Sequence, residues 1–533
     1  MLPFVGILTS IFSNSSDYWQ HFQHVELTYL LKNTFILTIA VLVVTLIMGV
    51  TVALASTMLD FPGRHLTVFL AIIPFTIPSY VMGFVWLYLF AHLPYSFGHL
   101  PMIAELFSRF SGFPGLVWSL SLSLFPYVFV MTRLRLQKID RDIFEAAQSL
   151  GHGLVTTTRT IVLPLLIPTI LAASFLVTSE VLSDFGTVSL FSYNTLTTAI
   201  FKAWFGFFAP HDALKVATIL LGFALTVLIL SRFFQSNQRI WQNGLNQLPP
   251  HHSQWQPQKL PAPWNYLTSV LVLGFLSLSS LLPVVALIYM SQANASFDSL
   301  GNILPIGIQS LIISGSVALT VTVLCTVILF ARRWLQDYQK QTSVSQGKWL
   351  GFLQKITYLP NLGYALPGAA VAICLFVPLS FLNQSTFLAI TPFFILLCTL
   401  TFHFYGVGDQ TLGPHFESLP RELDESAQSL KLSGSEIFFK VHLPLTSQPI
   451  IFCGLFLLID VLKELPITLM LRPLGWNTLS VKVYQWASEG LWEMAALPSL
   501  MLVVCSASIV IVLYLQGHFQ FSGNRLSHNY HLC

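Results

Sequence analysis

The sequence of 533 residues has few charged side chains for its length. Asp, Glu, Lys and Arg make up 9% of it, whereas a typical soluble domain has about 25%. So few charges cannot cover the surface of a soluble protein of this size, and a net charge of +3 excludes a basic, polyanion-binding protein. Disorder is excluded because 54% of the residues are hydrophobic and mean hydropathy is +0.71. The composition indicates a polytopic membrane protein.

Motifs of catalysis are also missing. The phosphate-binding pattern G-x-x-x-x-G-K-[ST] does not occur, since the one Gly-Lys pair, Gly347-Lys348, is followed by Trp349. We therefore expect a chain that does not hydrolyse ATP itself and is not an enzyme. The six cysteines form no CxxC pair and five lie in apolar segments, so they are expected to be free. No catalytic residue, metal site or cofactor is expected.

Eleven apolar runs are long enough to cross a bilayer, whose core of about 30 Å needs about 20 helical residues. Backbone polar groups must be paired inside lipid, so each run is expected to be a helix. The runs cover residues 34–58, 68–91, 114–133, 161–182, 213–234, 266–290, 307–331, 355–382, 388–405, 441–466 and 497–515. The prediction is an all-α membrane protein.

The basic residues predict the orientation of these runs. When the loop between runs 114–133 and 161–182 is placed in the cytoplasm, eighteen of the 25 Lys and Arg residues fall on the cytoplasmic side. The opposite side and its span ends receive the other seven. The inverted topology would reverse this bias, so we predict that this loop is cytoplasmic.

The chain repeats itself with an offset of 280 residues. The segment RDIFEAAQSLGHGLVTTTRTIVLPL at 141–165 aligns without a gap with RELDESAQSLKLSGSEIFFKVHLPL at 421–445, with nine identities in 25 positions. The sequence therefore predicts two homologous six-span halves, residues 1–242 and 265–533. A proline-rich cytoplasmic linker over residues 243–264 would join them.

The same offset indicates a truncated first span in the amino-terminal half. It aligns Leu2-Pro3 with Leu282-Pro283, which lies near the middle of run 266–290. Either Met1 is an internal methionine of a longer reading frame, or the first helix is short but functional.

The aligned loops contain a spaced pattern of small, acidic and apolar residues. In the first half it reads Glu145-Ala146-Ala147, three residues, Gly151, nine residues, Ile161, one residue, Leu163-Pro164. Residues 139–150 have the apolar spacing of a short helix, which Gly151 can end, and Pro164 is expected in the first turn of the next span. The second copy keeps Glu425, Ala427, Leu443 and Pro444 but has Ser426, Lys431 and Val441 at the other positions.

This pattern closely resembles the EAA signature of permease subunits of binding-protein-dependent ABC importers. The resemblance covers essentially the whole chain. The paired segments SDFGTVSLF at 183–191 and KELPITLMLRP at 463–473, in one fused and duplicated chain, look most like the ferric-iron permeases. The thiamine permeases, also fused and duplicated, are the nearest alternative.

The resemblance implies a type I ABC importer transmembrane fold in the bacterial inner (plasma) membrane, embedded in membrane lipid. Its expected partners are two copies of an ATP-binding cassette subunit and a periplasmic substrate-binding protein, without nucleic acid. In the family the EAA element is a coupling helix that docks on the ATP-binding subunit. The coupling residues expected here are Glu145, Ala146, Ala147, Gly151, Leu163, Pro164, Glu425, Ala427, Leu443 and Pro444. A secondary transporter with repeated halves is the alternative of another class, but it has no ATPase for such loops to dock on.

Ionisable residues in the spans mark a candidate substrate pathway. The offset aligns Glu180 with Asp460 and Asp184 with Glu464, and Lys463 lies among them. We expect these side chains to face one another between the halves, near the pathway entrance. Their oxygen atoms suit a hard cation such as Fe³⁺. The alternative is that salt bridges with Lys463 hold the two halves together.

Overall fold

The computed structural model describes residues 19–20, 22–96, 101–139, 145–147, 149–245, 257–292, 297–341, 362–380 and 392–515. Regular structure in these ranges is helical apart from one pair of two-residue parallel strands, β1 (Leu59–Asp60) and β2 (Gln258–Lys259). This pair joins the end of the first long helix to the segment that precedes the second half. Residues 1–18 and most of the predicted linker lie outside the described residues, so the truncated first span and the domain boundaries stay predictions.

The first half contains α-helices and three π-helical turns, labelled η. They are η1 (Phe22–Glu26), α3 (Leu27–Met58), α4 (Arg64–Thr76), α5 (Ser79–Ser96), α6 (Pro101–Arg109), α7 (Phe113–Leu136), α9 (Leu154–Thr157), η2 (Thr158–Val162), α10 (Leu163–Ser183), α11 (Gly186–Leu190), α12 (Leu196–Phe201), η3 (Lys202–Gly206) and α13 (Pro210–Leu245).

The second half repeats most of this order. Its elements are α14 (Trp264–Leu276), η4 (Ser277–Leu281), α15 (Leu282–Gln292), α16 (Phe297–Gln341), α18 (Leu362–Ala365), α19 (Gly368–Ser380), α21 (Pro392–Ser418), α22 (Glu422–Ser429), α23 (Gly434–Ile437), η6 (Phe438–His442), α24 (Leu443–Leu445), α25 (Ser447–Lys463), α26 (Pro466–Leu471), α27 (Leu479–Ser488) and α28 (Trp492–Leu515).

The apolar runs of the sequence correspond to the long helices. Among the described residues, eight helices are long and apolar enough to cross a membrane, and two bent pairs raise the number to ten. The shorter apolar helix Gly368–Val377 falls in the remaining predicted run, 355–382. All eleven runs therefore coincide with helices over their described residues, and the all-α membrane fold is confirmed.

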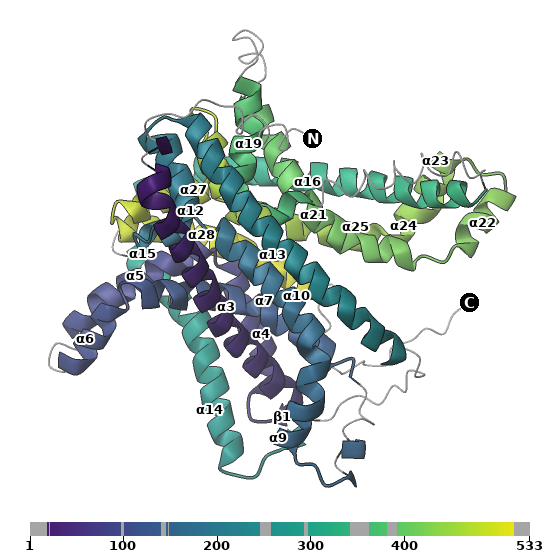
Figure 1. Cartoon of the computed structure of the whole chain (residues 1–533), viewed down its shortest axis with the longest axis horizontal. Coiled ribbons are helices and arrows are strands. Elements are labelled where there is room, and N and C mark those ends of the chain that lie inside the picture. Colours follow the sequence, from purple (N-terminus) through teal and green to yellow (C-terminus); the bar gives the residue numbers. More distant parts are fainter. Residues whose placement is uncertain are drawn as a thin grey trace.

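The two halves are intertwined around a shared core. Helix α13 of the first half packs against α19 of the second, and α28 packs against α4 and α5. Trp86 and Leu182 belong to the same buried cluster as Val371 and Leu457 of the other half. Figure 1 shows two arms that diverge from this region, one with α3, α7 and α10 towards α9, the other with α16, α21 and α25 towards α22 and α23.

A π-helical turn precedes each repeated Leu-Pro step. The Leu163 N–H donates to the carbonyl of Thr158, five residues earlier, and η6 places the same turn before Leu443-Pro444. Proline has no N–H to donate, and its ring crowds the carbonyl four residues earlier, so a wider turn relieves the clash. Pro164 lies in the first turn of α10 as predicted, but the continuous span begins already at Leu154.

The equivalent spans of the two halves differ in one bend. In the first half, Leu154–Ser183 is a single span, whereas in the second Gly434–Leu445 and Ser447–Lys463 meet at 72°. Pro449 cannot donate to the carbonyl of Leu445, and its ring crowds that carbonyl. Proline alone does not break the helix, because α10 of the first half continues through Pro168, one position earlier in the alignment.

Two hydroxyl side chains strengthen the bend. Thr446 Oγ1 donates to the carbonyl of His442 at 2.7 Å, and Ser447 Oγ donates to the carbonyl of Pro444 at 2.8 Å. Such bonds from Ser and Thr to the preceding turn bend helices. The offset of 280 places Leu166 and Ile167, which cannot form these bonds, at the same positions of the first half.

Candidate functional site

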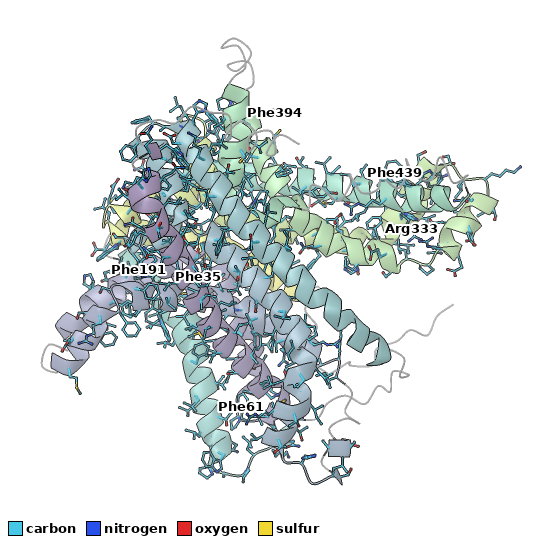
Figure 2. All side chains as sticks on the ribbon, in the orientation of Figure 1. Phe35, Phe61, Phe191, Arg333, Phe394 and Phe439 are labelled. Atoms are coloured by element: carbon cyan, nitrogen blue, oxygen red, sulfur yellow. The ribbon has the colours of Figure 1, made fainter. Side chains whose placement is uncertain are left out.

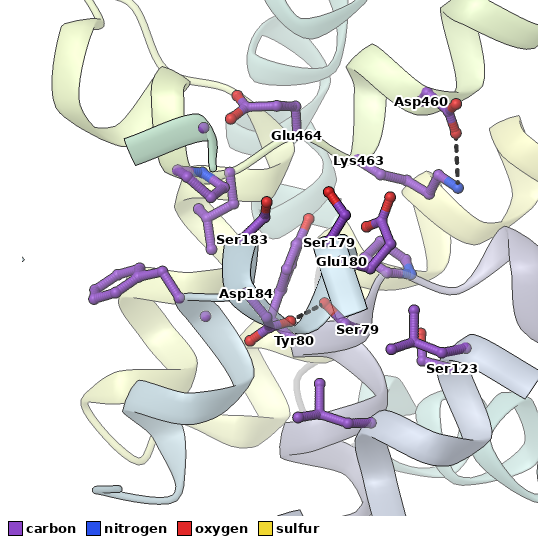
Figure 3. Close-up of a pocket in the computed structure, with 18 of the residues that line it drawn as sticks. Ser79, Tyr80, Ser123, Ser179, Glu180, Ser183, Asp184, Asp460, Lys463 and Glu464 are labelled. Atoms are coloured by element: carbon purple, nitrogen blue, oxygen red, sulfur yellow. Dashed lines mark hydrogen bonds and ion pairs between the residues drawn. The ribbon is translucent and has the colours of Figure 1, made fainter. Parts of the chain in front are cut away.

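A cavity of about 150 Å³ lies where the two halves meet. The first half contributes the break between α4 and α5, part of α7, and the junction of α10 with α11. The second contributes α18, α19, α21 and the junction of α25 with α26. All four predicted pathway carboxylates, Glu180, Asp184, Asp460 and Glu464, line this cavity (Figure 3). The structure thus brings together the residues that the repeat paired.

Both carboxylate oxygens of Asp184 accept hydrogen bonds from residues of the first half. Its Oδ1 accepts the backbone N–H of Thr187 at 2.9 Å and of Val188 at 3.3 Å. Its Oδ2 accepts hydroxyl hydrogen bonds from Ser79 at 2.5 Å and Thr187 at 2.9 Å. The carboxylate therefore caps the first turn of α11 and fixes the corner between α10 and α11.

Glu464 does the same in the second half. Its Oε1 accepts the Ile467 N–H at 2.5 Å, and its Oε2 accepts the Thr468 N–H at 3.0 Å and the Thr468 hydroxyl at 2.6 Å. These bonds cap the first turn of α26. Asp184 and Glu464 therefore occupy equivalent positions with equivalent bonds, and both shape the cavity wall.

Glu180 and Asp460 face partners from across the cavity or from their own helix. Tyr364 of the second half donates its hydroxyl to Glu180 Oε1 of the first at 2.7 Å. Lys463 Nζ lies 3.3 Å from Asp460 Oδ1 of its own helix. It also donates to the backbone carbonyl of Phe75 in the first half at 3.0 Å, and it lies 4.1 Å from the centre of the Phe75 ring. Tyr364 and Lys463 therefore link the two halves, Lys463 through the carbonyl of Phe75. The ion pair of Lys463 with Asp460 lies within α25 and does not join the halves.

These two links are related by the repeat but differ in chemistry. Phe75 and Tyr364 each lie two residues before the apolar–proline pair at the break between consecutive helices. The Tyr364 hydroxyl reaches Glu180. Phe75 has no hydroxyl, and the Lys463 ammonium lies beside the equivalent Asp460 instead (Figure 3). One side of the cavity thus has a neutral donor and the other a charged one.

Several cavity residues were not predicted from the sequence. They are Ser79, Tyr80, Tyr127, Tyr364 and His403, all of which line the cavity. The Tyr80 side chain is buried, and His403 Nδ1 bonds the carbonyl of Gly363 at 3.0 Å. The signal was available for His403, because the offset of 280 aligns it with Ser123, another polar residue in an apolar run.

The described residues contain no group of three or more His, Cys, Asp or Glu side chains placed to hold a metal ion. Four carboxylates and the one ammonium of Lys463 line the cavity, so its field favours a cation.

The two predicted coupling segments expose the same pattern of side chains. Glu145 and Ala146 are exposed and Ala147 is buried; in α22, Glu425 is exposed and Ala427 is buried. Pro164 and Pro444 are exposed, and Leu163 and Leu443 are half-buried. Residues 140–144 and 148 lie outside the described residues. Of the other residues in the predicted helix over 139–150, residues 145–147 and 149 are helical, whereas 139 and 150 are not.

Both coupling segments end through a residue with left-handed backbone. Gly151 has φ +82° and Lys431 has φ +59°. The next N–H bonds the carbonyl five residues earlier in each half, His152 to Ala147 at 3.0 Å and Leu432 to Ala427 at 3.2 Å, as in a Schellman motif. The predicted helix end at Gly151 is confirmed, and Lys431 ends its helix in the same way despite its side chain.

Comparison with known proteins identifies the superfamily. Residues 45–239 match the family described as binding-protein-dependent transport system inner membrane component. The chain is an ABC importer permease. It is a multi-pass protein of the inner membrane and resembles the fused ferric-iron permeases.

The names of the individual relatives give different transported substrates. The permease is 27% identical to the Fe(3+)-transport system permease protein FbpB 2 of Haemophilus influenzae over 496 residues, which are 91% of this chain and 89% of that protein. It is 27% identical to a probable molybdenum ABC transporter permease of Haloferax volcanii over 36% of this chain and 68% of that protein. It is 26% identical to a probable sulfate transport system permease of Marchantia polymorpha over 39% and 72%.

Proposed function

We propose that this permease imports ferric iron. The observation that carries the proposal is the length of the similarity. The Fe(3+)-transport relative aligns with 91% of the chain, whereas the molybdenum and sulfate relatives align with 36% and 39%. Only the first of these three similarities includes both halves, the cavity between them and both coupling segments.

The energy for transport would come from ATP hydrolysis by two copies of an ATP-binding subunit, which dock on the segments Glu145–Gly151 and Glu425–Lys431. Three features support this. The segments lie on separate arms, they expose equivalent residues, and each presents a leucine, Leu150 at 77% and Leu430 at 75% exposure, beside its helix end. An exposed leucine with a small buried alanine nearby suits close packing against another protein surface.

The substrate would arrive from a periplasmic binding protein and pass through the cavity. Glu180 and Asp460 are the pathway carboxylates, because each has one described side-chain donor beside it. Asp184 and Glu464 contribute charge, but their oxygens are bonded to α11 and α26. An acidic cavity attracts a trivalent cation without a fixed chelating set, which suits release after each cycle.

Gentle detergent purification of the full chain from its native membrane tests the assignment. We expect an ATP-binding subunit to co-purify, and a binding protein captured with it to contain iron by metal analysis. The same ATP-binding subunit with a thiamine-loaded binding protein would keep the importer mechanism and overturn the substrate. Absence of any ATP-binding subunit after crosslinking would instead favour a secondary transporter.

Charge neutralisation in the cavity tests the pathway. Glu180→Gln, whose amide oxygen can still accept the Tyr364 hydroxyl, should lower iron uptake by about tenfold or more with little change in thermal stability. Asp460→Asn should lower uptake similarly and should also lower stability, because it leaves the largely buried Lys463 ammonium without its carboxylate. Asp184→Asn and Glu464→Gln should lower stability and uptake together, because they weaken the caps of α11 and α26. Normal uptake by the Glu180 and Asp460 variants at normal expression would remove these residues from the pathway.

A further inference from the structure

The second arm contains a buried cluster of polar side chains next to its coupling helix. Arg333 lies on α16, with its side chain 12% exposed. Its Nη1 donates to the carbonyls of Phe416 at 2.9 Å and Leu419 at 3.0 Å, and its Nη2 donates to that of Pro420 at 3.0 Å. These carbonyls belong to the end of α21 and to the turn that enters α22. The guanidinium thus holds the chain on the amino-terminal side of the coupling helix.

Asp424 extends this cluster into the coupling helix itself. Arg333 Nε donates to Asp424 Oδ2 at 2.6 Å, and His442 Nε2 donates to Asp424 Oδ1 at 2.5 Å. The Asp424 side chain is 8% exposed and that of His442 is 2% exposed. One carboxylate of α22 therefore binds both α16 and η6. We call Arg333, Asp424 and His442 the clamp.

The clamp lies directly before the bend of this arm. His442 is the last residue of η6, and its carbonyl accepts the Thr446 N–H at 2.9 Å and the Thr446 hydroxyl at 2.7 Å. Beyond the 72° bend, α25 runs to Asp460 and Lys463 at the cavity. The coupling helix, the bend and the cavity are thus connected through consecutive contacts. Figure 2 locates Arg333 and Phe439 on this arm.

The first half lacks the clamp. The Leu196 N–H donates to Thr34, and the Leu479 N–H donates to Ser310 in the same way, which makes α3 and α16 equivalent with an offset of 276 residues. Thr57 then occupies the position of Arg333.

The offset of 280 places Phe144 and Val162 at the positions of Asp424 and His442. Thr57, Phe144 and Val162 carry no charge and cannot form an ion pair. The clamp is therefore specific to the coupling helix whose EAA motif is incomplete.

We propose that Arg333, Asp424 and His442 are positioning residues that lock the second coupling helix to its arm. Movement that the ATP-binding subunit imposes on α22 then reaches the bend at Thr446 instead of being lost as local motion of α22. Buried charge-assisted hydrogen bonds are directional and strong in a low dielectric, so they resist such local motion. The inference rests on the proposed coupling role of α22.

Variants of the clamp should uncouple ATP hydrolysis from transport. In the full chain reconstituted with its co-purified ATP-binding subunit and iron-loaded binding protein, Asp424→Asn and His442→Leu should keep ATP hydrolysis within about twofold. Iron moved per ATP should fall by about tenfold, within the range of allosteric coupling effects. His442→Gln, whose amide can still donate to Asp424, should retain most coupling.

The neighbouring pair Glu436 and Lys440 provides a matched control, because its 2.9 Å ion pair is exposed. Glu436→Gln should leave both rates unchanged. Equal losses of hydrolysis and uptake in Asp424→Asn, His442→Leu and His442→Gln would reduce the clamp to a merely structural role. Unchanged iron uptake per ATP in Asp424→Asn and His442→Leu would show that the clamp has no role in coupling.

A distance measurement tests whether the clamp fixes α22 relative to η6, whatever the transported substrate is. Spin labels at Ser429 in α22 and Phe439 in η6 should give one narrow distance distribution, the same with and without ATP. Asp424→Asn should broaden it, whereas Glu436→Gln should not. A wild-type distance that changes with ATP, or no broadening in Asp424→Asn, would overturn the proposal. A wild-type complex that hydrolyses ATP but moves no iron would overturn only the substrate.

Discussion

Each of the two arms contains a buried arginine that joins two of its helices, but the arginine lies on a different helix in each half. In the first half, Arg133 of α7 donates to Ser56 of α3 at 3.0 Å. In the second, Arg332 of α16, at the position of Ser56, pairs with Asp409 of α21 at 2.5 Å. Both arginine side chains are buried. The two halves therefore join equivalent helices through a buried arginine whose partner is a neutral hydroxyl in the first half and a carboxylate in the second.

The same helix pairs also approach each other closely at a glycine, and this glycine lies on a different helix in each half. A Cβ on Gly49 of α3 would lie 2.5 Å from Val128 of α7, and a Cβ on Gly408 of α21 would lie 2.7 Å from Cys325 of α16. The small residue is on α3 in the first half and on the opposite helix, α21, in the second. Each close approach is therefore kept by a compensating pair, and single residues of the two halves are not interchangeable.

The largest effect is expected from breaking the charged pair of the second arm. Asp409→Leu leaves the buried Arg332 guanidinium without its carboxylate and should destabilise the protein by about 3–5 kcal/mol. The double variant Arg332→Met with Asp409→Leu should recover most of that loss, since both buried charges are removed. Thermal unfolding of the purified permease in detergent measures both. A single variant as stable as the wild type would contradict a contribution of this pair.

An intermediate effect on stability is expected from filling the close approach between α16 and α21. Gly408→Val places branched carbons against Cys325 and should cost about 1–3 kcal/mol of unfolding free energy. Adding Cys325→Gly recreates the arrangement of Gly49 and Val128 and should restore stability. If the double variant is less stable than Gly408→Val alone, the two helix pairs do not pack equivalently.

The smallest effect concerns the ends of the coupling helices. Lys431 has φ +59°, which costs a residue with a side chain about 1 kcal/mol relative to glycine. Lys431→Gly should therefore stabilise the protein by up to about 1 kcal/mol, and Gly151→Lys should destabilise it by a similar amount. Thermal unfolding of the two variants side by side provides the comparison, and shifts of the same sign would argue against a shared helix-ending role.

The sequence predicted the elements that depend on local pattern and on the repeat. Apolar runs located the spans, and the offset of 280 paired Glu180 with Asp460 before any contact was known. It could not predict that Tyr364 reaches Glu180, because that contact depends on how the halves intertwine. Arg333 counted only as a basic residue on the predicted cytoplasmic side, since its hydrogen-bond partners lie 83 to 91 positions further along the chain.

ATP-driven uptake of radioactive iron tests the central claim most directly. Proteoliposomes would contain the full permease with its co-purified ATP-binding subunit, with the iron-loaded binding protein outside and ATP enclosed. The account predicts accumulation of iron that requires ATP and falls in Glu180→Gln and Asp460→Asn. ATP hydrolysis stimulated by the binding protein but without iron accumulation in the wild type would contradict it.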